Sequence, residues 1–158
     1  MSARVKIAGH PIHPMLVAIP IGLWIFTLTS DVVYAATGDP RWQATAFFTL
    51  AGGIAGALLA AVPGLFDLLG LQGSRERRIG ILHMSVNLAI VVVQAINFIL
   101  RATSQADTNL TIALSALSVA VLLISGWLGG HLVHVLGVTQ PDHVESRAAQ
   151  RDRLHPLA

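Results

Sequence analysis

The sequence predicts an all-α integral membrane protein, an up-down bundle of four helices. Hydrophobic residues make up 54% of the chain and charged residues only 11%, with a mean hydropathy of +0.68. A soluble domain usually has about a quarter of its residues charged, so this surface is suited to lipid rather than water. Four apolar segments are each long enough to cross a bilayer as a helix, which takes roughly 20 residues. At 158 residues, one compact domain is expected.

The four helices are expected at about residues 15–36, 44–71, 79–100 and 110–136. Their connectors, which read TGDPRWQ, QGSRERR and RATSQADTN, are short and rich in turn-forming residues. Short connections make successive helices antiparallel, which gives an up-down bundle with both termini on one side. The expected organisation is a transmembrane domain over residues 1–138 and a polar cytoplasmic tail over 139–158.

The distribution of basic residues predicts on which side of the membrane the two termini lie. Only Arg41 and Arg101 fall on the side opposite the termini. Cytoplasmic loops carry an excess of lysine and arginine, so both termini are expected in the cytoplasm and the chain in a bacterial inner membrane. A cleaved signal peptide is the rival interpretation of the first segment, but its apolar stretch is too long. The basic residues on the side of the termini are Arg4, Lys6, Arg75, Arg77, Arg78, Arg147, Arg151 and Arg153.

Composition also excludes several classes of site. The chain has no cysteine, which rules out disulfides, iron–sulfur clusters held by its own thiolates and covalently attached c-type haem. The net charge of +2 is small, and no basic-aromatic pattern is present, so nucleic acid is not an expected partner. The lipid bilayer is the expected environment.

Histidines mark the candidate site. The predicted topology puts five of the seven at the cytoplasmic boundary of the membrane, and Asp67 ends the second helix near the same face. Ionisable side chains at membrane depth are costly, so they call for a partner or a function. We therefore expect a histidine cluster that binds a ligand. The five are His10, His13, His83, His131 and His134.

Local spacing supports this grouping. In the opening HPIHP, each histidine precedes a proline, which favours extended or polyproline backbone and would project His10 and His13 from one side. Pro14 can then occupy the first position of the helix. His131 and His134 are three apart in the expected fourth helix and would share a face. The alternative is that these residues only end their helices at the solvated interface.

The third helix carries a polar stripe formed by His83, Asn87, Gln94 and Asn97. Three amides cannot face lipid, so the stripe is expected to face the interior of the bundle. It either holds helices together by hydrogen bonds or presents His83 as a ligand with Asn87 behind it. Asp31 is expected to meet Gln94 or Asn97.

Small residues predict close helix packing. Gly52, Gly56, Ala60 and Gly64 recur every four residues in the second helix, a spacing that lets another helix approach closely. Pro63 is expected to kink this helix before Asp67. In the fourth helix, Gly129 and Gly130 leave room before His131 for a bulky ligand or for a neighbouring helix.

Four stretches of the sequence, GHPIHPMLVAIPIGLW, PGLFDLLG, RRIGILHMSVN and GGHLVHVLGV, resemble the bacterial membrane family catalogued as domain of unknown function 2231. The similarity runs from Gly9 to about Val138. It implies a four-helix membrane protein, and because some members are joined to Rieske or cytochrome domains, it implies electron transfer by association. His10, His13, Asp67, His83 and His131 correspond to motif positions of the family, whereas His134 departs from it.

Three functions remain open. The first is a b-type haem protein that transfers electrons, with His83 and His131 as axial ligands, His13 as the alternate, and Arg75, Arg77 and Arg78 near the propionates. The second is a non-haem iron, zinc or copper centre. The third is a non-catalytic membrane module, either a scaffold or a small subunit for a redox partner. Assembly into a homo-oligomer is left open as well. Electron transfer or binding is favoured over a stand-alone enzyme. The ligands of the non-haem metal centre would come from His10, His13, Asp67, His83, His131 and His134.

Overall fold

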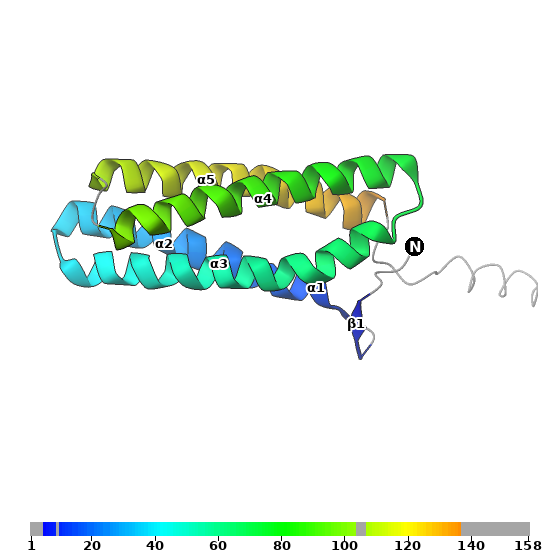
Figure 1. Cartoon of the computed structure of the whole chain (residues 1–158), viewed down its shortest axis with the longest axis horizontal. Coiled ribbons are helices and arrows are strands. Elements are labelled where there is room, and N and C mark those ends of the chain that lie inside the picture. The colour runs from blue at the N-terminus through cyan, green and yellow to red at the C-terminus, as the bar shows by residue number, and fades with distance from the viewer. Residues whose placement is uncertain (1–4, 9, 104–106, 137–158) are drawn as a thin grey trace, which may run out of the picture.

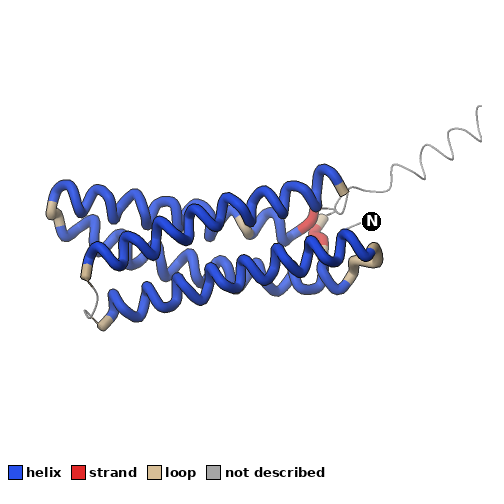
Figure 2. The backbone as a smooth tube through the Cα atoms, turned by 90° about the horizontal axis from the view of Figure 1, so that it is seen from above, coloured by secondary structure: helices blue, strands red, loops and turns tan. Residues whose placement is uncertain are grey.

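A computed structural model describes residues 5–8, 10–103 and 107–136, and it confirms the four-helix bundle. Each of the four long helices runs antiparallel to the next along the chain (Figures 1 and 2). The expected tail over 139–158 lies outside the described residues. The elements in chain order are β1 Lys6–Ile7, β2 His10–Pro11, α1 Ile12–Leu16, α2 Ala18–Thr37, α3 Pro40–Leu69, α4 Ser74–Ala102, α5 Thr108–Gly130 and the π-helical turn η1 His131–Val135.

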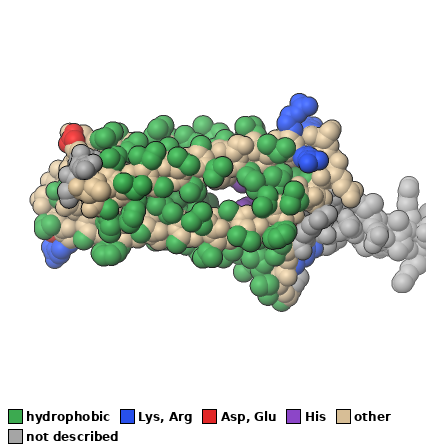
Figure 3. Space-filling view, viewed as in Figure 1, with side chains coloured by type: hydrophobic (Ala, Val, Ile, Leu, Met, Phe, Trp, Pro, Cys, Tyr) green, Lys and Arg blue, Asp and Glu red, His purple; other side chains and the backbone are tan. Residues whose placement is uncertain are grey.

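Within the described residues, four helical spans are long and apolar enough to cross a membrane: Ile12–Thr37, Pro40–Leu69, Ser74–Ala102 and Thr108–Val135. Their outward surface is apolar, and lysine and arginine gather at the two ends of the bundle (Figure 3). Phe48 and Leu123, for example, are about 70% exposed. A surface of this kind is stable against lipid and not against water, so the protein spans the membrane several times.

The interior of the bundle combines an apolar middle with polar flanks. Trp24, Leu50, Ile90 and Leu122 form a buried cluster in which all four long helices take part. Polar side chains that face inward toward the two ends are buried as well, among them Thr27, Ser30, Asp31, Gln94, Asn97, Ser115 and Ser125. The predicted inward direction of the polar stripe on α4 is therefore confirmed.

The helices reach further into the connectors than the sequence suggested. α4 begins at Ser74, so most of the expected connector QGSRERR is helical. Glu76 lies in the first turn of α4, where a carboxylate is favourable beside the positive end of the helix dipole. The first described residues and η1 lie at the same end of the bundle, as an even number of crossings requires (Figure 1).

The HPIHP segment differs from its expected extended conformation. His10 and Pro11 pair with Lys6 and Ile7 in a short antiparallel hairpin, but His13 is already helical. Pro14 is the third residue of α1 rather than the first. Helix tolerates it there because the amide groups of the first turn have no partner within the helix. The expectation that His10 and His13 project from one side is therefore wrong.

The turn between α2 and α3 is built from Gly38 and Asp39. Gly38 has a φ of +69°, a left-handed conformation that glycine adopts without steric cost. Asp39 caps α3 by accepting a hydrogen bond from the Arg41 backbone N–H at 3.0 Å. Its carboxylate also accepts from the Arg41 guanidinium, and these hydrogen bonds hold the pKa of Asp39 below its ordinary value.

The small residues of α3 are used inside the bundle. A Cβ atom added at Gly53 would lie 2.3 Å from Nε1 of Trp24, and one added at Gly56 would lie 2.7 Å from the Ile19 side chain. A Cβ atom added at Gly52 would lie 3.1 Å from Cδ1 of Leu23, and one added at Gly64 would lie 2.8 Å from the His13 ring. The predicted close approach of another helix is therefore confirmed, and the neighbours are α2 and α1.

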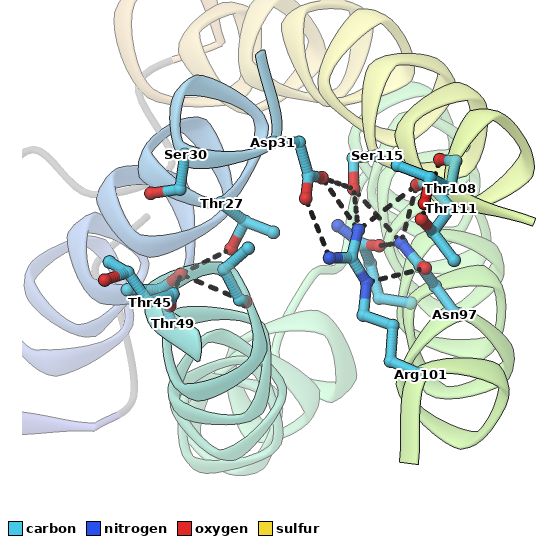
Figure 4. A network of polar contacts seen from close by, with 12 residues as sticks. Thr27, Ser30, Asp31, Thr45, Thr49, Asn97, Arg101, Thr108, Thr111 and Ser115 are labelled. Atoms are coloured by element: carbon cyan, nitrogen blue, oxygen red, sulfur yellow. Dashed lines mark hydrogen bonds and ion pairs between the residues drawn. The ribbon is translucent and has the colours of Figure 1, made fainter. Parts of the chain in front are cut away.

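A polar network connects the helices at the end of the bundle opposite β1 and η1 (Figure 4). Arg101 donates two hydrogen bonds of 2.7 Å to the carboxylate of Asp31. Ser115 donates to the same carboxylate at 2.9 Å, and Asn97 accepts from Nε of Arg101 at 3.1 Å. The expected direct contact of Asp31 with Gln94 or Asn97 is wrong, because the arginine lies between them and neutralises the buried carboxylate.

Candidate functional site

His13 and His83 come together near the end of the bundle where β1 and η1 lie. His13 lies in α1, His83 lies in the third turn of α4, and their ring centroids are 6.4 Å apart with ring planes nearly perpendicular, at 87°. Both rings are half-buried. Figure 3 shows histidine atoms in a hollow on one face of the bundle.

Both rings are held by the backbone through Nδ1. Nδ1 of His13 lies 2.8 Å from the carbonyl oxygen of Ala60, and Nδ1 of His83 lies 3.0 Å from that of Ser125. A carbonyl can only accept, so each Nδ1 carries the proton and donates it. The proton-free atom of each neutral ring is then Nε2, the nitrogen with a lone pair for a metal. Histidine ligands of metals are commonly oriented by such a bond.

Asn87 links His83 to α5. Its Nδ2 donates to the Ser125 hydroxyl at 2.6 Å and to the His83 carbonyl at 2.8 Å, and it lies 3.2 Å from Nε2 of His83. Asn87 is therefore next to His83, as expected, but it lies against Nε2, whereas the Ser125 carbonyl holds Nδ1. This contact joins α4 to α5, so it also stabilises the bundle whether or not His83 binds a ligand.

Glycines make the space for both imidazoles. A Cβ atom at Gly64 would lie 2.8 Å from Cε1 and Nδ1 of His13, and a Cβ atom at Gly129 would lie 3.1 Å from Cε1 of His83. Gly130 has open space around its Cα. The room that Gly129 was expected to leave is therefore taken up by the His83 ring, while an added Cβ atom at Gly130 would meet no neighbour within 4 Å.

The other candidate ligands lie apart from this pair. His10 is exposed and its Nδ1 contacts the Ala8 carbonyl at 3.0 Å, whereas His131 packs against Trp127 with ring centroids 5.7 Å apart. Asp67 accepts a hydrogen bond from the Val5 backbone N–H at 3.3 Å. Among the described residues, no three histidine or acidic side chains lie together so that they could hold a metal ion. The expected convergence of five histidines is not found.

A π-helical turn explains why His131 and His134 separate. The Leu136 N–H bonds to the His131 carbonyl at 3.1 Å, five residues back, so η1 is wider than an α-helix. Residues three apart do not lie above one another in such a turn. His131 is consequently half-buried and His134 exposed, and the prediction that they share a face is wrong.

The arginines expected near haem propionates lie at the same end of the bundle as the His13–His83 pair. Arg75, Arg77 and Arg78 occupy the first turns of α4, one to two turns before His83, and all three are exposed. Chemically, the site offers two fixed imidazoles with cations close by in sequence. That donor set fits a group that takes two axial nitrogen ligands.

Sequence reasoning missed the partner of Asp31. Arg101 was assigned to a connector, yet it is the last polar residue of α4, and its side chain is only 9% exposed. The signal was available, because Arg101 follows Asn97 by four residues and so continues the stripe that begins at His83. A carboxylate in an apolar helix also requires a counter-charge.

Comparison with known families and structures gives one match. Residues 9–142 match the family described as "Predicted membrane protein (DUF2231)". No curated protein matches the chain. No solved structure matches it either. Since the match covers most of the sequence and all four membrane-spanning helices, the chain belongs to the DUF2231 family of predicted membrane proteins.

Proposed function

We propose that this protein binds a b-type haem through His13 and His83 and transfers electrons in the membrane. The observation that carries the proposal is the imidazole pair itself, with both Nδ1 atoms donating to backbone carbonyls and the ring centroids 6.4 Å apart. Two histidines are the usual axial pair for haem iron in electron transfer. When bound, haem supplies a one-electron couple.

The chain's own residues would orient and tune such a group. The carbonyls of Ala60 and Ser125 fix the two rings and raise the basicity of their Nε2 atoms. Asn87 would give up its contact with Nε2 of His83. It would keep its shorter hydrogen bonds to the Ser125 hydroxyl and the His83 carbonyl. Arg75, Arg77 and Arg78 supply positive charge for the propionates at the membrane surface.

The ligand count favours haem over a non-haem ion. Iron, zinc or copper bound by the protein alone takes three or four protein ligands. Within the described residues, the site offers two imidazoles and no third histidine or acidic group. The second candidate is a non-catalytic module of a redox complex, which the Asn87–Ser125 bridge between α4 and α5 favours because it stabilises the bundle without a ligand.

We place the protein in the inner membrane of a bacterium with both termini in the cytoplasm. The support is the basic residues, eight on the side of the termini against two on the other. The histidine pair then lies near the cytoplasmic face. A C-terminal alkaline phosphatase fusion is expected to be inactive and a C-terminal fluorescent protein fusion bright. The reverse pattern would contradict this orientation.

Absorption spectroscopy tests the haem proposal. The full chain, purified in detergent from haem-replete cells, is expected to show a Soret band that sharpens and shifts when dithionite reduces it. His13→Ala and His83→Ala are each expected to lose most of this band, because one axial ligand is removed. His10→Ala and His134→Ala change exposed histidines and serve as matched controls that keep it.

Three results would overturn the haem proposal. They are a spectrum without a Soret band, a band that persists in both His13→Ala and His83→Ala, and a band lost equally in the two controls. Elemental analysis of the same samples separates the alternatives. Stoichiometric iron, zinc or copper without a Soret band would indicate a non-haem centre, and the absence of all three metals would leave the structural module.

A further inference from the structure

A second cavity lies at the opposite end of the bundle from the histidine pair. Its volume is about 500 Å³, within the range of about 300–1,000 Å³ typical of small-molecule sites. It opens where the four long helices end, and all four contribute residues to its walls. Arg101, which lines it, follows His83 by 18 residues on α4, a distance of about 27 Å along the helix.

The floor of this cavity is the ion pair of Asp31 and Arg101. The two side chains are 4% and 9% exposed and are joined at 2.7 Å. Because each charge neutralises the other, the floor attracts neither a cation nor an anion strongly. It still presents polar N–H and carboxylate groups in a fixed arrangement, since Ser115 and Asn97 hold the pair in place. Such a floor suits a neutral ligand with polar atoms.

Three of the polar side chains on the wall have no hydrogen-bond partner within the described part of the chain. Tyr34, Gln43 and Thr108 line the cavity, and none of their side chains makes a hydrogen bond to a described residue. Elsewhere in the bundle the hydroxyl groups of threonines are bonded, as Thr27, Thr45 and Thr49 show (Figure 4). The phenol, amide and hydroxyl groups are therefore available as hydrogen-bond donors to a ligand.

The rest of the wall is largely apolar. Phe47 and Phe48 line it together with Ala44 and Leu100. Phe47 is stacked on Phe98 with ring centroids 4.8 Å apart, which fixes its orientation. Phe48 is 71% exposed on the outer surface of α3, so the cavity is continuous with the side that faces lipid. A ring can stack on such a wall while an apolar tail extends into the membrane.

We propose that this cavity binds the head of a membrane quinone, a neutral flat ring that carries two carbonyl oxygens and an apolar tail. The carbonyl oxygens accept hydrogen bonds from Tyr34, Gln43, Thr108 or Arg101, and the ring packs on the phenylalanine wall. Binding of this ligand does not depend on the haem proposal, because the two sites share no residue. The site adds a lipid-soluble redox carrier to the molecule's ligands.

Calorimetric titration of the full-length detergent-purified protein with ubiquinone-1, a quinone with a short tail, tests this site. Saturable binding is expected. Tyr34→Phe and Gln43→Ala are each expected to weaken it about fivefold to tenfold, the effect of one lost hydrogen bond. Ala44→Phe fills the cavity and is expected to weaken binding at least about tenfold.

Ala55→Phe is the matched control for Ala44→Phe. It places the same side chain on the exposed surface of α3, away from the cavity, and is expected to leave binding unchanged. The proposal is overturned if ubiquinone-1 does not bind saturably, or if Ala44→Phe and Ala55→Phe behave alike. Benzoate, a flat ring with a carboxylate, is titrated for comparison. Tighter binding of benzoate than of ubiquinone-1 would overturn the proposal and assign the cavity to anions.

Discussion

Replacement of Asp31 by asparagine is expected to lower the free energy of unfolding by about 3–5 kcal/mol, because it leaves the buried Arg101 charge without its partner. Ser115, Asn97 and the Thr111 carbonyl hold the pair in place, and its side chains are only 4% and 9% exposed, so water compensates little for the lost carboxylate. Arg101→Gln should destabilise the protein to a similar extent, since it strands the carboxylate. Reversible unfolding in mixed detergent micelles measures both.

A double variant separates the contribution of the two charges to stability from that of side-chain packing. Asp31→Asn combined with Arg101→Gln removes both charges and keeps side chains of similar size, so it is expected to be more stable than either single variant. Arg41→Gln is a matched control at the same end of the bundle, because the Arg41–Asp39 pair is exposed and should matter little. Additive effects of the two single changes would show that the ion pair does not stabilise the fold.

Substitution at Gly53 is expected to disrupt the contact between α2 and α3. The new Cβ in Gly53→Ala would lie 2.3 Å from Nε1 and 2.4 Å from Cδ1 of Trp24, well inside van der Waals contact. Trp24 is 2% exposed and belongs to the central apolar cluster, so it has little room to move. Overpacking of this kind costs about 1–3 kcal/mol or more, and we expect the upper part of that range.

Gly126→Ala is the control for this prediction. A Cβ atom at Gly126 has no neighbour within 4 Å, and the residue lies in the interior of α5. There the substitution is expected to leave stability unchanged or to raise it slightly, because alanine loses less backbone entropy in a helix. Equal effects at the two positions in thermal or chemical unfolding would mean that the close approach of α3 to Trp24 does not limit packing.

The sequence predicts the fold well because the lipid bilayer limits the backbone structures that a membrane-spanning chain can adopt. Apolar length and short connectors suffice for four antiparallel helices, and the amides Gln94 and Asn97 show which face of α4 points inward. The glycines of α3 likewise indicate a close helix contact. Each of these inferences uses a local pattern whose period is that of the helix.

The candidate site is predicted less well because it depends on local deviations from regular helices. Periodicity assumes an α-helix at His131 and His134, but the turn there is π-helical and turns the two rings apart. Proline rules favour extended backbone at His13, but the first turn of a helix tolerates Pro14. The haem pair expected from sequence was His83 with His131, and the pair that the structure brings together is His83 with the alternate, His13.

Electron paramagnetic resonance of the oxidised protein tests the two-histidine site most directly. We predict a low-spin ferric haem signal typical of two imidazole ligands, which is mostly lost in His13→Ala and in His83→Ala, with the small remaining haem fraction high-spin, and which is retained in His131→Ala. If the protein contains no ferric haem signal, or if the low-spin signal is lost in His131→Ala and retained in His13→Ala, the proposed ligation by His13 and His83 is contradicted.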